Sequence, residues 1–509
     1  MILAPVRSAR NLLRLLQIAF ILARYDALFL LDLLPDVFQL LRVFRLLRLR
    51  EVDSLRPGQR LAAALQHLGP SFIKLGQALA TRADLLGEAI ANDLTSLQDR
   101  LPPFPVEEAR AIIAAEFGRK VEDIFAKFDN TPVAAASIAQ VHFAVTHQGE
   151  EVAVKILRPG IEAAFARDLD LFFWLAQLLE RAQPAFLRLR PVEVVRTLAD
   201  SVRLEMDLRL EAAAASEFGE NFAGDLGFRV PRINWPLTSR RVLTLERIHG
   251  LRIDHREALI AAGHDLGAIL EEASRAFFNQ VFRDGFFHAD LHPGNLFVDA
   301  KGTIVAIDFG IMGRLDRKTR YYLADMLLGF LTGDYRRVAE VHFEAGYVPA
   351  HQSIDTFTQA CRSIGEPILG RPLHEISLGR LLAQLFQITK QFEMETQPQL
   401  LMLQKTMVLV EGLGRKLDPS VNIWTLAQPL IEEWMRVNRG PEARVLDFFK
   451  DGAATLERLP EILRNLERAA KSVTEKDRAA ASGKDSHPLA LPLWAGAAAL
   501  IAIALGMWL

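Results

Sequence analysis

The pattern of hydrophobic and polar positions changes character along the chain. Residues 59–97 and 106–117 predict two helices, with a proline pair between them. Apolar residues then alternate with polar ones over residues 138–145, and after a polar turn a second apolar run covers residues 152–156. This spacing predicts an antiparallel hairpin.

Helical segments return beyond the hairpin, at residues 161–181 and 191–218, and a further strand is predicted at residues 241–246. The remainder is mostly helical, interrupted by short apolar strands at residues 296–298 and 304–307. A small strand-rich region followed by a larger helical region predicts an α+β fold with two lobes.

Composition narrows the class of protein. The 509 residues are too many for one hydrophobic core, so several structural units are expected. The 60 lysines and arginines nearly balance the 62 aspartates and glutamates, so no overall field favours nucleic acid as a partner. The single cysteine, Cys361, excludes an intrachain disulfide and a thiolate metal cluster.

The carboxyl end of the chain is strongly apolar. Residues 487–509 contain no Asp, Glu, Lys or Arg, and about 20 such residues suffice for a helix to cross a bilayer. Trp494 and Trp508 lie near the ends of this run, as interfacial anchors would. The run predicts a transmembrane helix; a terminal helix packed into the globular core is the alternative. Its small residues would also suit a partner helix in the membrane, and a homodimer is one form that such a pairing can take.

Residues 1–57 predict basic amphipathic helices. Arg42, Arg45 and Arg48 form a basic stripe, and the apolar residues between them fill the other side of the helix. Such a helix lies in a membrane interface or docks on the protein itself, and both interpretations are open.

Four residues in three motifs carry the candidate chemistry. Lys155 ends the strand motif Val-Ala-Val-Lys, whose lysine contacts ATP phosphates. Asp290 and Asn295 stand five residues apart in His-Ala-Asp-Leu-His-Pro-Gly-Asn, which is the interval of a kinase catalytic loop. Asp308 begins an Asp-Phe-Gly motif directly after an apolar strand, in the setting where kinases bind magnesium.

The combination of these motifs fits the demands of phosphoryl transfer, which needs cations against the phosphates and a carboxylate at the attacking oxygen. ATP and magnesium are therefore the predicted cofactors. Lys155 and Asp290 are the predicted catalytic residues, and Asn295 and Asp308 the predicted metal ligands. Each motif alone also fits a plain turn or an exposed strand end. Their common occurrence in this order favours a protein-kinase-like fold.

Three departures from ordinary protein kinases make residues 60–440 resemble the UbiB family of atypical kinases. The first is an alanine-rich segment in place of a glycine-rich loop, and the resemblance implies that it binds ATP. Alanine restricts φ where glycine does not, so this loop is expected to be stiffer. Its residues are Pro132, Val133, Ala134, Ala135, Ala136, Ser137, Ile138, Ala139 and Gln140.

The second departure is the family motif Lys-Leu-Gly-Gln. Its Lys74 and Gln77 share a helix face at positions i and i+3. The resemblance implies a regulatory segment that covers the cleft where a peptide substrate would dock. It also implies that backbone groups near Glu246 and Ile248, where the two lobes join, hold the adenine of ATP.

The third departure is a group of carboxylates on the predicted helix at residues 191–218. In a continuous helix Asp207 and Glu211 share a face, while Glu205 points elsewhere. Glu211 is therefore predicted to pair with Lys155 in catalysis. Glu205 and Asp207 are left to meet the lysine of the Lys-Leu-Gly-Gln motif, as regulatory residues.

The resemblance implies a kinase or ATPase that supports ubiquinone biosynthesis. Polyprenylphenol-like lipids and the biosynthetic enzymes are the expected partners, and the expected location is a bacterial inner membrane with the catalytic domain on the cytoplasmic face. Two alternatives stay open. One is a polyprenylphenol hydroxylase in which His288, Asp290 and His292 form an iron triad. The other is a pseudokinase scaffold that binds nucleotide without turnover.

The predicted organisation combines these segments into a two-lobed protein-kinase-like fold with additions at both ends. The expected domains are basic amphipathic helices (1–57), a helical extension (58–130), a strand-rich lobe (131–250), a helical lobe (251–440), a helical and polar linker (441–486) and a transmembrane helix (487–509).

Overall fold

A computed structural model describes most of the chain between residues 3 and 439. Contacts divide the chain into two compact units, Met1–Glu432 and Glu433–Leu509. The fold and the candidate site described below belong to the first unit. The described residues are 3–27, 54–80, 87–94, 97, 101–182, 191–367, 388–389, 391–394, 397–418 and 423–439.

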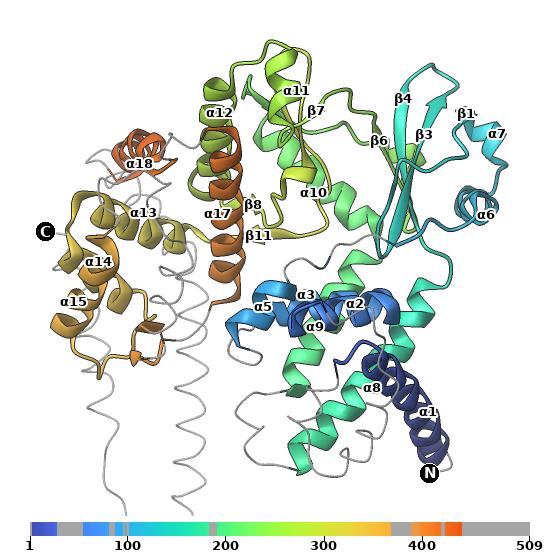
Figure 1. Cartoon of the computed structure of the whole chain (residues 1–509). Coiled ribbons are helices and arrows are strands. Elements are labelled where there is room, and N and C mark those ends of the chain that lie inside the picture. Colours follow the sequence, from blue (N-terminus) through green and yellow to red (C-terminus); the bar gives the residue numbers. More distant parts are fainter. Residues whose placement is uncertain are drawn as a thin grey trace, which may run out of the picture. The chain divides into compact units, whose positions relative to one another are not determined.

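Helices predominate among the described residues (Figure 1). The helices are α1 (Leu3–Arg24), α2 (Pro57–Leu68), α3 (Pro70–Ala80), α5 (Glu88–Leu94), α6 (Val106–Phe117), α7 (Val121–Ile124), α8 (Ile161–Ala182), α9 (Pro191–Glu205), α10 (Leu208–Asn221), α11 (Arg256–Ala261), α12 (Leu266–Phe278), α13 (Arg317–Thr332), α14 (Tyr335–Glu344), α15 (Ile354–Gly365), α17 (Pro398–Leu417) and α18 (Ile423–Arg439). The strands are β1 (Phe125–Phe128), β2 (Ala134–Ala135), β3 (Ala139–Thr146), β4 (Glu151–Leu157), β5 (Phe228–Arg229), β6 (Val242–Glu246), β7 (Leu251–Arg252), β8 (Phe286–His288), β9 (Leu296–Val298), β10 (Ile304–Ala306) and β11 (Met312–Arg314).

The predicted hairpin is the centre of a five-stranded antiparallel sheet. The strand order is β1-β3-β4-β6, and β2 pairs with β3 (Figure 1). Strands β3 and β4 pair over their whole length, with Val141 opposite Lys155. The turn between them contains Gly149 at φ 83°, a conformation that glycine adopts without a Cβ penalty. The predicted hairpin and the strand at residues 241–246 are confirmed.

The two faces of this sheet are covered by different helices. Val154 and Ile156 of β4 share a core with Ile113 of α6, and Val242 of β6 belongs to the same core. Its neighbour Leu243 points to the opposite face and joins the core formed with α2, α3, α8 and α9. Successive residues of a strand face opposite sides, so β6 anchors both layers. The lysine of β4 thus stands on a strand fixed from both faces.

Two predicted helices are each broken into shorter ones. Residues 59–97 form α2, α3 and α5, and the first break falls at Gly69, whose φ is 104°. Pro70 lacks an amide hydrogen and disfavours helical geometry in the residue before it, so α2 ends there. Residues 191–218 form α9 and α10, because Asp207 leaves the helix and caps α10 by accepting a hydrogen bond from the amide of Arg209.

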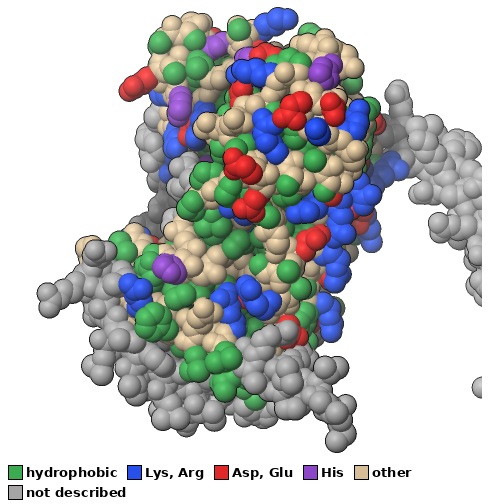
Figure 2. Space-filling model, turned by 90° about the vertical axis from the view of Figure 1, so that its right-hand side faces the viewer, with side chains coloured by type: hydrophobic (Ala, Val, Ile, Leu, Met, Phe, Trp, Pro, Cys, Tyr) green, Lys and Arg blue, Asp and Glu red, His purple; other side chains and the backbone are tan. Residues whose placement is uncertain are grey.

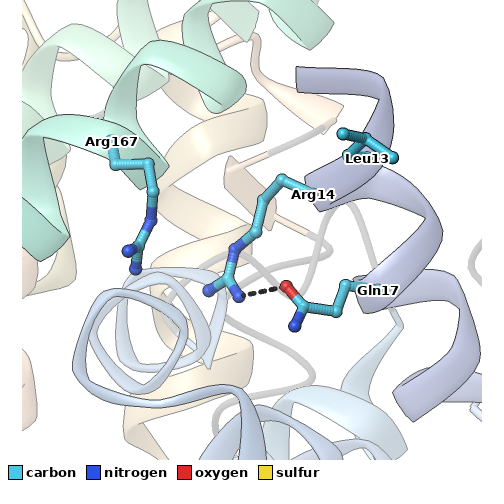
Figure 3. Close-up of a pocket in the computed structure, with 4 residues that line it drawn as sticks. All are labelled: Leu13, Arg14, Gln17 and Arg167. Atoms are coloured by element: carbon cyan, nitrogen blue, oxygen red, sulfur yellow. Dashed lines mark hydrogen bonds between the residues drawn. The ribbon is translucent and has the colours of Figure 1, made fainter. Parts of the chain in front are cut away.

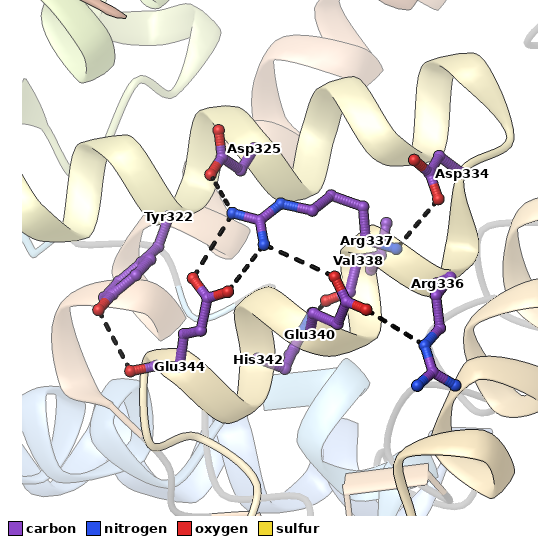
Figure 4. A network of polar contacts seen from close by, with 9 residues as sticks. All are labelled: Tyr322, Asp325, Asp334, Arg336, Arg337, Val338, Glu340, His342 and Glu344. Atoms are coloured by element: carbon purple, nitrogen blue, oxygen red, sulfur yellow. Dashed lines mark hydrogen bonds and ion pairs between the residues drawn. The ribbon is translucent and has the colours of Figure 1, made fainter. Parts of the chain in front are cut away.

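The larger helical region holds short strands that carry loops. Strands β9 and β10, both expected from the sequence, pair antiparallel, and β8 pairs with β11. Beside them, α13 and α14 are joined by a polar network (Figure 4). Arg337 of α14 contacts Asp325 of α13 at 3.0 Å and Glu344 of its own helix at 2.7 Å. One guanidinium thus donates hydrogen bonds to carboxylates of both helices.

The expected fold class needs one correction. Among the described residues, no helix is long and apolar enough to cross a membrane. Helices α1 and α8 reach 22 residues each, but charged side chains interrupt their apolar runs. This finding overturns the transmembrane helix as part of the fold class. The segment assigned to it, residues 487–509, lies outside the described residues, as do the linker 441–486 and the arginine stripe of residues 42–48.

Helix α1 is amphipathic and packs against α2 and α8. On the face shown in Figure 2, acidic and basic side chains are interspersed above, and hydrophobic ones gather below. Among residues 11–24 of α1, whose side chains the structure describes, Leu12, Leu13, Leu16 and Phe20 are large, hydrophobic and exposed. A cavity of about 350 Å³ between α1 and α8 is lined by Leu13, Arg14, Gln17 and Arg167 (Figure 3). None of these residues belongs to the candidate site.

Candidate active site

Lys155 on β4 is held by two carboxylates from distant parts of the chain. Its ammonium Nζ lies 2.7 Å from Oε1 of Glu211 and 3.2 Å from Oδ1 of Asp308. The Lys155 and Glu211 side chains are mostly buried, with 14% and 9% of their surface exposed, whereas half of the Asp308 side chain faces solvent. The expected ion pair between Lys155 and Glu211 is present, and Glu211 lies on the first turn of α10.

The charges of these three groups shift their pKa values in a connected way. Burial by itself would lower the pKa of Lys155, but the charges of Asp308 and Glu211 outweigh it and raise that pKa. The Lys155 ammonium lowers the pKa of Asp308 to about 2. Burial raises the pKa of Glu211, and Lys155 opposes this rise. For Glu211, burial favours the neutral acid and the Lys155 ammonium favours the carboxylate. The short contacts of Lys155 with two carboxylates keep its ammonium charged.

Asp308 has an unusual backbone conformation. Its φ is 64°, in the left-handed region that residues other than glycine rarely adopt. The next residue, Phe309, is buried and lies with its ring centroid 5.6 Å from that of Phe218 on α10. Packing of Phe309 thus fixes the turn that aims the Asp308 carboxylate. Conformations of this kind persist where surrounding structure holds them, and they concentrate at functional sites.

The loop after β8 fixes the backbone of Asp290 on both sides. The Asp290 amide donates to Nδ1 of His288 at 3.1 Å, and the Asn295 side-chain amide donates to the Asp290 carbonyl oxygen at 3.1 Å. His288 is fully buried and its Nε2 faces the carbonyl oxygen of Ile307, so its proton is assigned to Nε2. Burial lowers the pKa of His288, which keeps the ring neutral.

The carboxylate of Asp290 meets a residue that the motifs did not reveal. Nζ of Lys405, on α17, lies 2.8 Å from Oδ1 of Asp290. The two residues are 115 positions apart, and Lys405 belongs to no recognised motif. One lysine on an amphipathic helix carries no signal that would separate it from a solvated side chain.

The alanine-rich segment forms a tight hairpin with β3. Strand β2 pairs with β3, and the amide of Ala136 donates to the carbonyl oxygen of Ala139 at 2.8 Å. Arg158, which sequence reasoning missed, donates to the carbonyl oxygens of Ala136 at 3.0 Å and Pro102 at 2.9 Å. The buried Ser137 hydroxyl has no hydrogen-bond partner among the described residues. An unpartnered buried hydroxyl in this loop fits a phosphate oxygen.

Other residues predicted for ATP binding have partners within the protein. The Gln140 side chain binds the backbone amide of Phe104 at 3.0 Å, so it holds the segment before α6. Glu246 ends β6, and its own amide donates to the carbonyl oxygen of Arg232 at 2.9 Å. Ile248 follows two residues later, on the way to β7.

The predicted regulatory residues separate into two groups. Lys74 of α3 lies 2.7 Å from Glu205 at the end of α9, and both side chains are only 9% exposed. Gln77 lies on the same helix and is partly buried. Asp207 does not meet Lys74; it pairs with Arg209 at 2.6 Å. The reason is that the helix breaks at Asp207, whereas the prediction assumed one continuous helix through this residue.

The donor set suits magnesium. Asn295 uses its amide nitrogen within the loop, which leaves its amide oxygen, and Asp308 offers an ionised carboxylate. Oxygen ligands of this kind are those that Mg²⁺ prefers. The iron triad is not formed, because both ring nitrogens of His288 face backbone groups and Nδ1 of His292 accepts from the amide of Gly294. The part of the chain that the structure describes holds no group of three His, Cys, Asp or Glu suited to a metal.

Comparisons with known proteins decide the family. Residues 96–342 match the ABC1 atypical kinase-like domain, and residues 361–422 match the UbiB helical domain. A protein from Marinobacter nauticus named probable protein kinase UbiB is 44% identical over 458 residues, which cover 89% of this chain and 84% of the relative. The chain belongs to the UbiB family of atypical kinases. The family predicted from the motifs is confirmed.

Further UbiB-family relatives and a solved structure agree. A protein of the same name from Azotobacter vinelandii is 44% identical over 471 residues, covering 91% of this chain and 87% of the relative. The structure of the Rv3197–erythromycin complex from Mycobacterium tuberculosis has 26% identity and a TM-score of 0.51, covering 70% of this chain and 91% of that one. The kinase-like fold is therefore shown, and α17 falls within the family's helical domain.

Proposed function

We propose that this chain is an ATP-dependent phosphotransferase or ATPase that supports ubiquinone biosynthesis. One observation carries the proposal: Lys155, Glu211 and Asp308, from three separate elements, meet within 3.2 Å. Asp290 and Asn295 stand in a single loop whose backbone is fixed. This is the set of charges that phosphoryl transfer requires.

Each residue has a defined role in the proposed reaction. Lys155 binds phosphate oxygens of ATP, and Glu211 orients Lys155. Asp290 accepts the proton of the attacking water or hydroxyl, whose oxygen forms a new bond to the γ-phosphorus. The bond from that phosphorus to the bridging oxygen breaks, and ADP leaves with the electron pair. Magnesium held by Asn295 and Asp308 would supply charge neutralisation on the phosphates.

Several features favour a lipid-linked role over routine phosphorylation of peptides. No Ala-Pro-Glu follows Asp308 through residue 338, so the motif of the usual peptide platform is missing. The Lys74–Glu205 pair fixes the segment that the family resemblance places over the peptide site. Helix α1 exposes leucine side chains. These features support polyprenylphenol-like precursors as the substrate or effector class.

The proposal is tested by ATP turnover of the purified full chain. We expect magnesium-dependent hydrolysis that is stimulated by vesicles containing a polyprenylphenol. Asp290→Asn keeps the shape of the side chain but cannot accept a proton, so turnover should fall by at least about 100-fold while nucleotide still binds. Glu217→Gln on the exposed side of α10 is the matched control. Unchanged hydrolysis in Asp290→Asn would remove Asp290 from the mechanism, and nucleotide binding without any turnover would favour a pseudokinase.

A further inference from the structure

Apart from the magnesium that Asn295 and Asp308 would hold, the kinase-type motifs supply one cation, Lys155, to the proposed site. Lys155 is one ammonium beside the carboxylates of Glu211 and Asp308, and Asp290 adds a third carboxylate. The proposed substrate is itself a polyanion, and its transition state spreads charge over the γ-phosphoryl oxygens. A second fixed cation near Asp290 would therefore lower the barrier.

Lys405 stands at that place. Its ammonium lies 2.8 Å from the Asp290 carboxylate, and about half of its side chain is exposed on the side open to solvent. An acceptor hydroxyl bound to Asp290 would lie about 3 Å from the carboxylate, which puts the reacting oxygen within about 6 Å of the ammonium. A lysine carries three donors on a flexible stem, so one can remain on Asp290 while another reaches a phosphoryl oxygen.

Docking of α17 does not explain the contact. An ion pair this exposed adds little to stability. The helix is fastened independently: Thr406 is fully buried with its hydroxyl 3.4 Å from the carbonyl oxygen of His288. Arg256 also donates to the carbonyl oxygen of Leu417 at 3.0 Å. Lys405 is therefore dispensable for the position of α17, although α17 is needed to place Lys405.

We propose that Lys405 is a further catalytic residue, which holds the Asp290 carboxylate and contacts the γ-phosphoryl group during transfer. This inference rests on the proposed function. The helical domain thereby completes the site, because α17 lies within residues 361–422 and outside the kinase-like match at residues 96–342. In the step, the acceptor proton passes to Asp290, the γ-phosphorus bonds to the acceptor oxygen, and ADP leaves with the electron pair, while Lys405 keeps its proton.

The test compares variants of two lysines on one helix. Lys405→Met removes the charge but keeps a similar volume, and Lys405→Arg keeps the charge. Lys416→Met is the control, because Lys416 is mostly exposed and its ammonium faces Asp254, at 3.8 Å, rather than Asp290. We measure kcat and KM for MgATP hydrolysis, the dissociation constant of a fluorescent ATP analogue, and the melting temperature of the full chain.

We expect Lys405→Met to lower kcat by about 10- to 100-fold with nucleotide affinity unchanged within about twofold, as for loss of one transition-state contact. Lys405→Arg should recover part of kcat, and Lys416→Met should match the wild type. The inference is overturned if Lys405→Met keeps kcat within about twofold of wild type, or if Lys416→Met loses as much.

Three further outcomes are distinguishable. If Lys405→Met melts more than about 5 °C lower, Lys405→Gln, which keeps a polar donor without charge, decides by the same kcat criterion. If the wild type turns over ATP, Asp290→Asn abolishes it and Lys405→Met does not, the role of Lys405 fails and the proposed function stands. A wild type without turnover, with and without lipid, overturns both.

Discussion

Lys74 of α3 and Glu205 of α9 form a 2.7 Å ion pair in which both side chains are nine-tenths buried. Charges removed from water in this way are costly unless they remain paired. The pair also lies within electrostatic reach of the catalytic cluster, because the charge of Glu205 contributes to the raised pKa of Glu211. The family motif on α3 is thus tied to the helix boundary next to the site.

Removal of this lysine should be strongly destabilising. Lys74→Met removes a cation from the buried Glu205 carboxylate, and we expect the free energy of unfolding to fall by about 3 kcal/mol. Lys127→Met is the control, because its ion pair with Asp129 is exposed and should contribute under about 1 kcal/mol. Urea denaturation measures both. Equal effects of the two variants would show that Lys74 and Glu205 are not buried as a pair.

Loss of the Glu211 charge should change the response to magnesium. In Glu211→Gln the lysine keeps only Asp308 as an ionic partner, so Lys155 competes more strongly with the metal for that carboxylate. We expect the magnesium concentration for half-maximal ATP turnover to rise about tenfold, in line with roughly 1.4 kcal/mol of competition. Glu217→Gln, whose pair with Arg314 is exposed, should leave the magnesium titration unchanged. A shift shared by both variants would contradict this account.

Substitution of Lys155 should alter how stability depends on pH. In the wild type the pKa of Asp308 is lowered to about 2, so its contribution to stability is present above the unfolded value and is lost as pH falls through about 2. Lys155→Met removes that cation, and the pKa of Glu211, already raised by burial, rises further. A raised carboxyl pKa contributes stability that is lost as pH increases.

The deficit of Lys155→Met relative to wild type should therefore grow between pH 4.5 and pH 8. Melting temperatures at a series of pH values measure it, with Lys155→Arg as the charge-preserving control. A deficit that stays constant with pH would mean that the lysine does not set the ionisation of its two neighbours.

Arg158 should govern ATP affinity through the alanine-rich loop. It joins the carbonyl oxygens of Ala136 and Pro102, and burial lowers its pKa. In Arg158→Met both carbonyls lose a charged donor, so the loop gains freedom and KM for ATP should rise about 5- to 20-fold, corresponding to roughly 1–2 kcal/mol. Arg203→Met, on the exposed face of α9, serves as control. A change in kcat with KM unaltered would argue against a role in the loop.

Local patterns predicted the parts of the site that depend on short stretches of sequence. The hairpin that carries Lys155 follows from alternation, and the loop between Asp290 and Asn295 follows from spacing. Pro70 signals the helix break at Gly69, but the helical pattern continues on both sides and predicts one long helix. Aspartate is a preferred N-cap residue, so Asp207 signals the start of a new helix. The prediction of a continuous helix did not take this signal into account.

Other contacts depend on how separate elements pack. Lys405 meets Asp290 only because α17 packs against α12 and β11, and no local pattern encodes that approach. Arg158 finds carbonyl partners rather than carboxylates, so charge pairing gave no clue to its role. The comparisons established the family over most of the chain, whereas the contacts of Lys405 and Arg158 follow only from the three-dimensional structure.

The separation of 115 positions between Asp290 and Lys405 has a consequence for synthesis on the ribosome. A nascent chain presents its catalytic loop well before α17 has been translated. Under the proposed role of Lys405, a chain cut short between these points carries every kinase motif yet lacks the cation that we place at Asp290. Full turnover would then depend on translation through α17, which ends at Leu417.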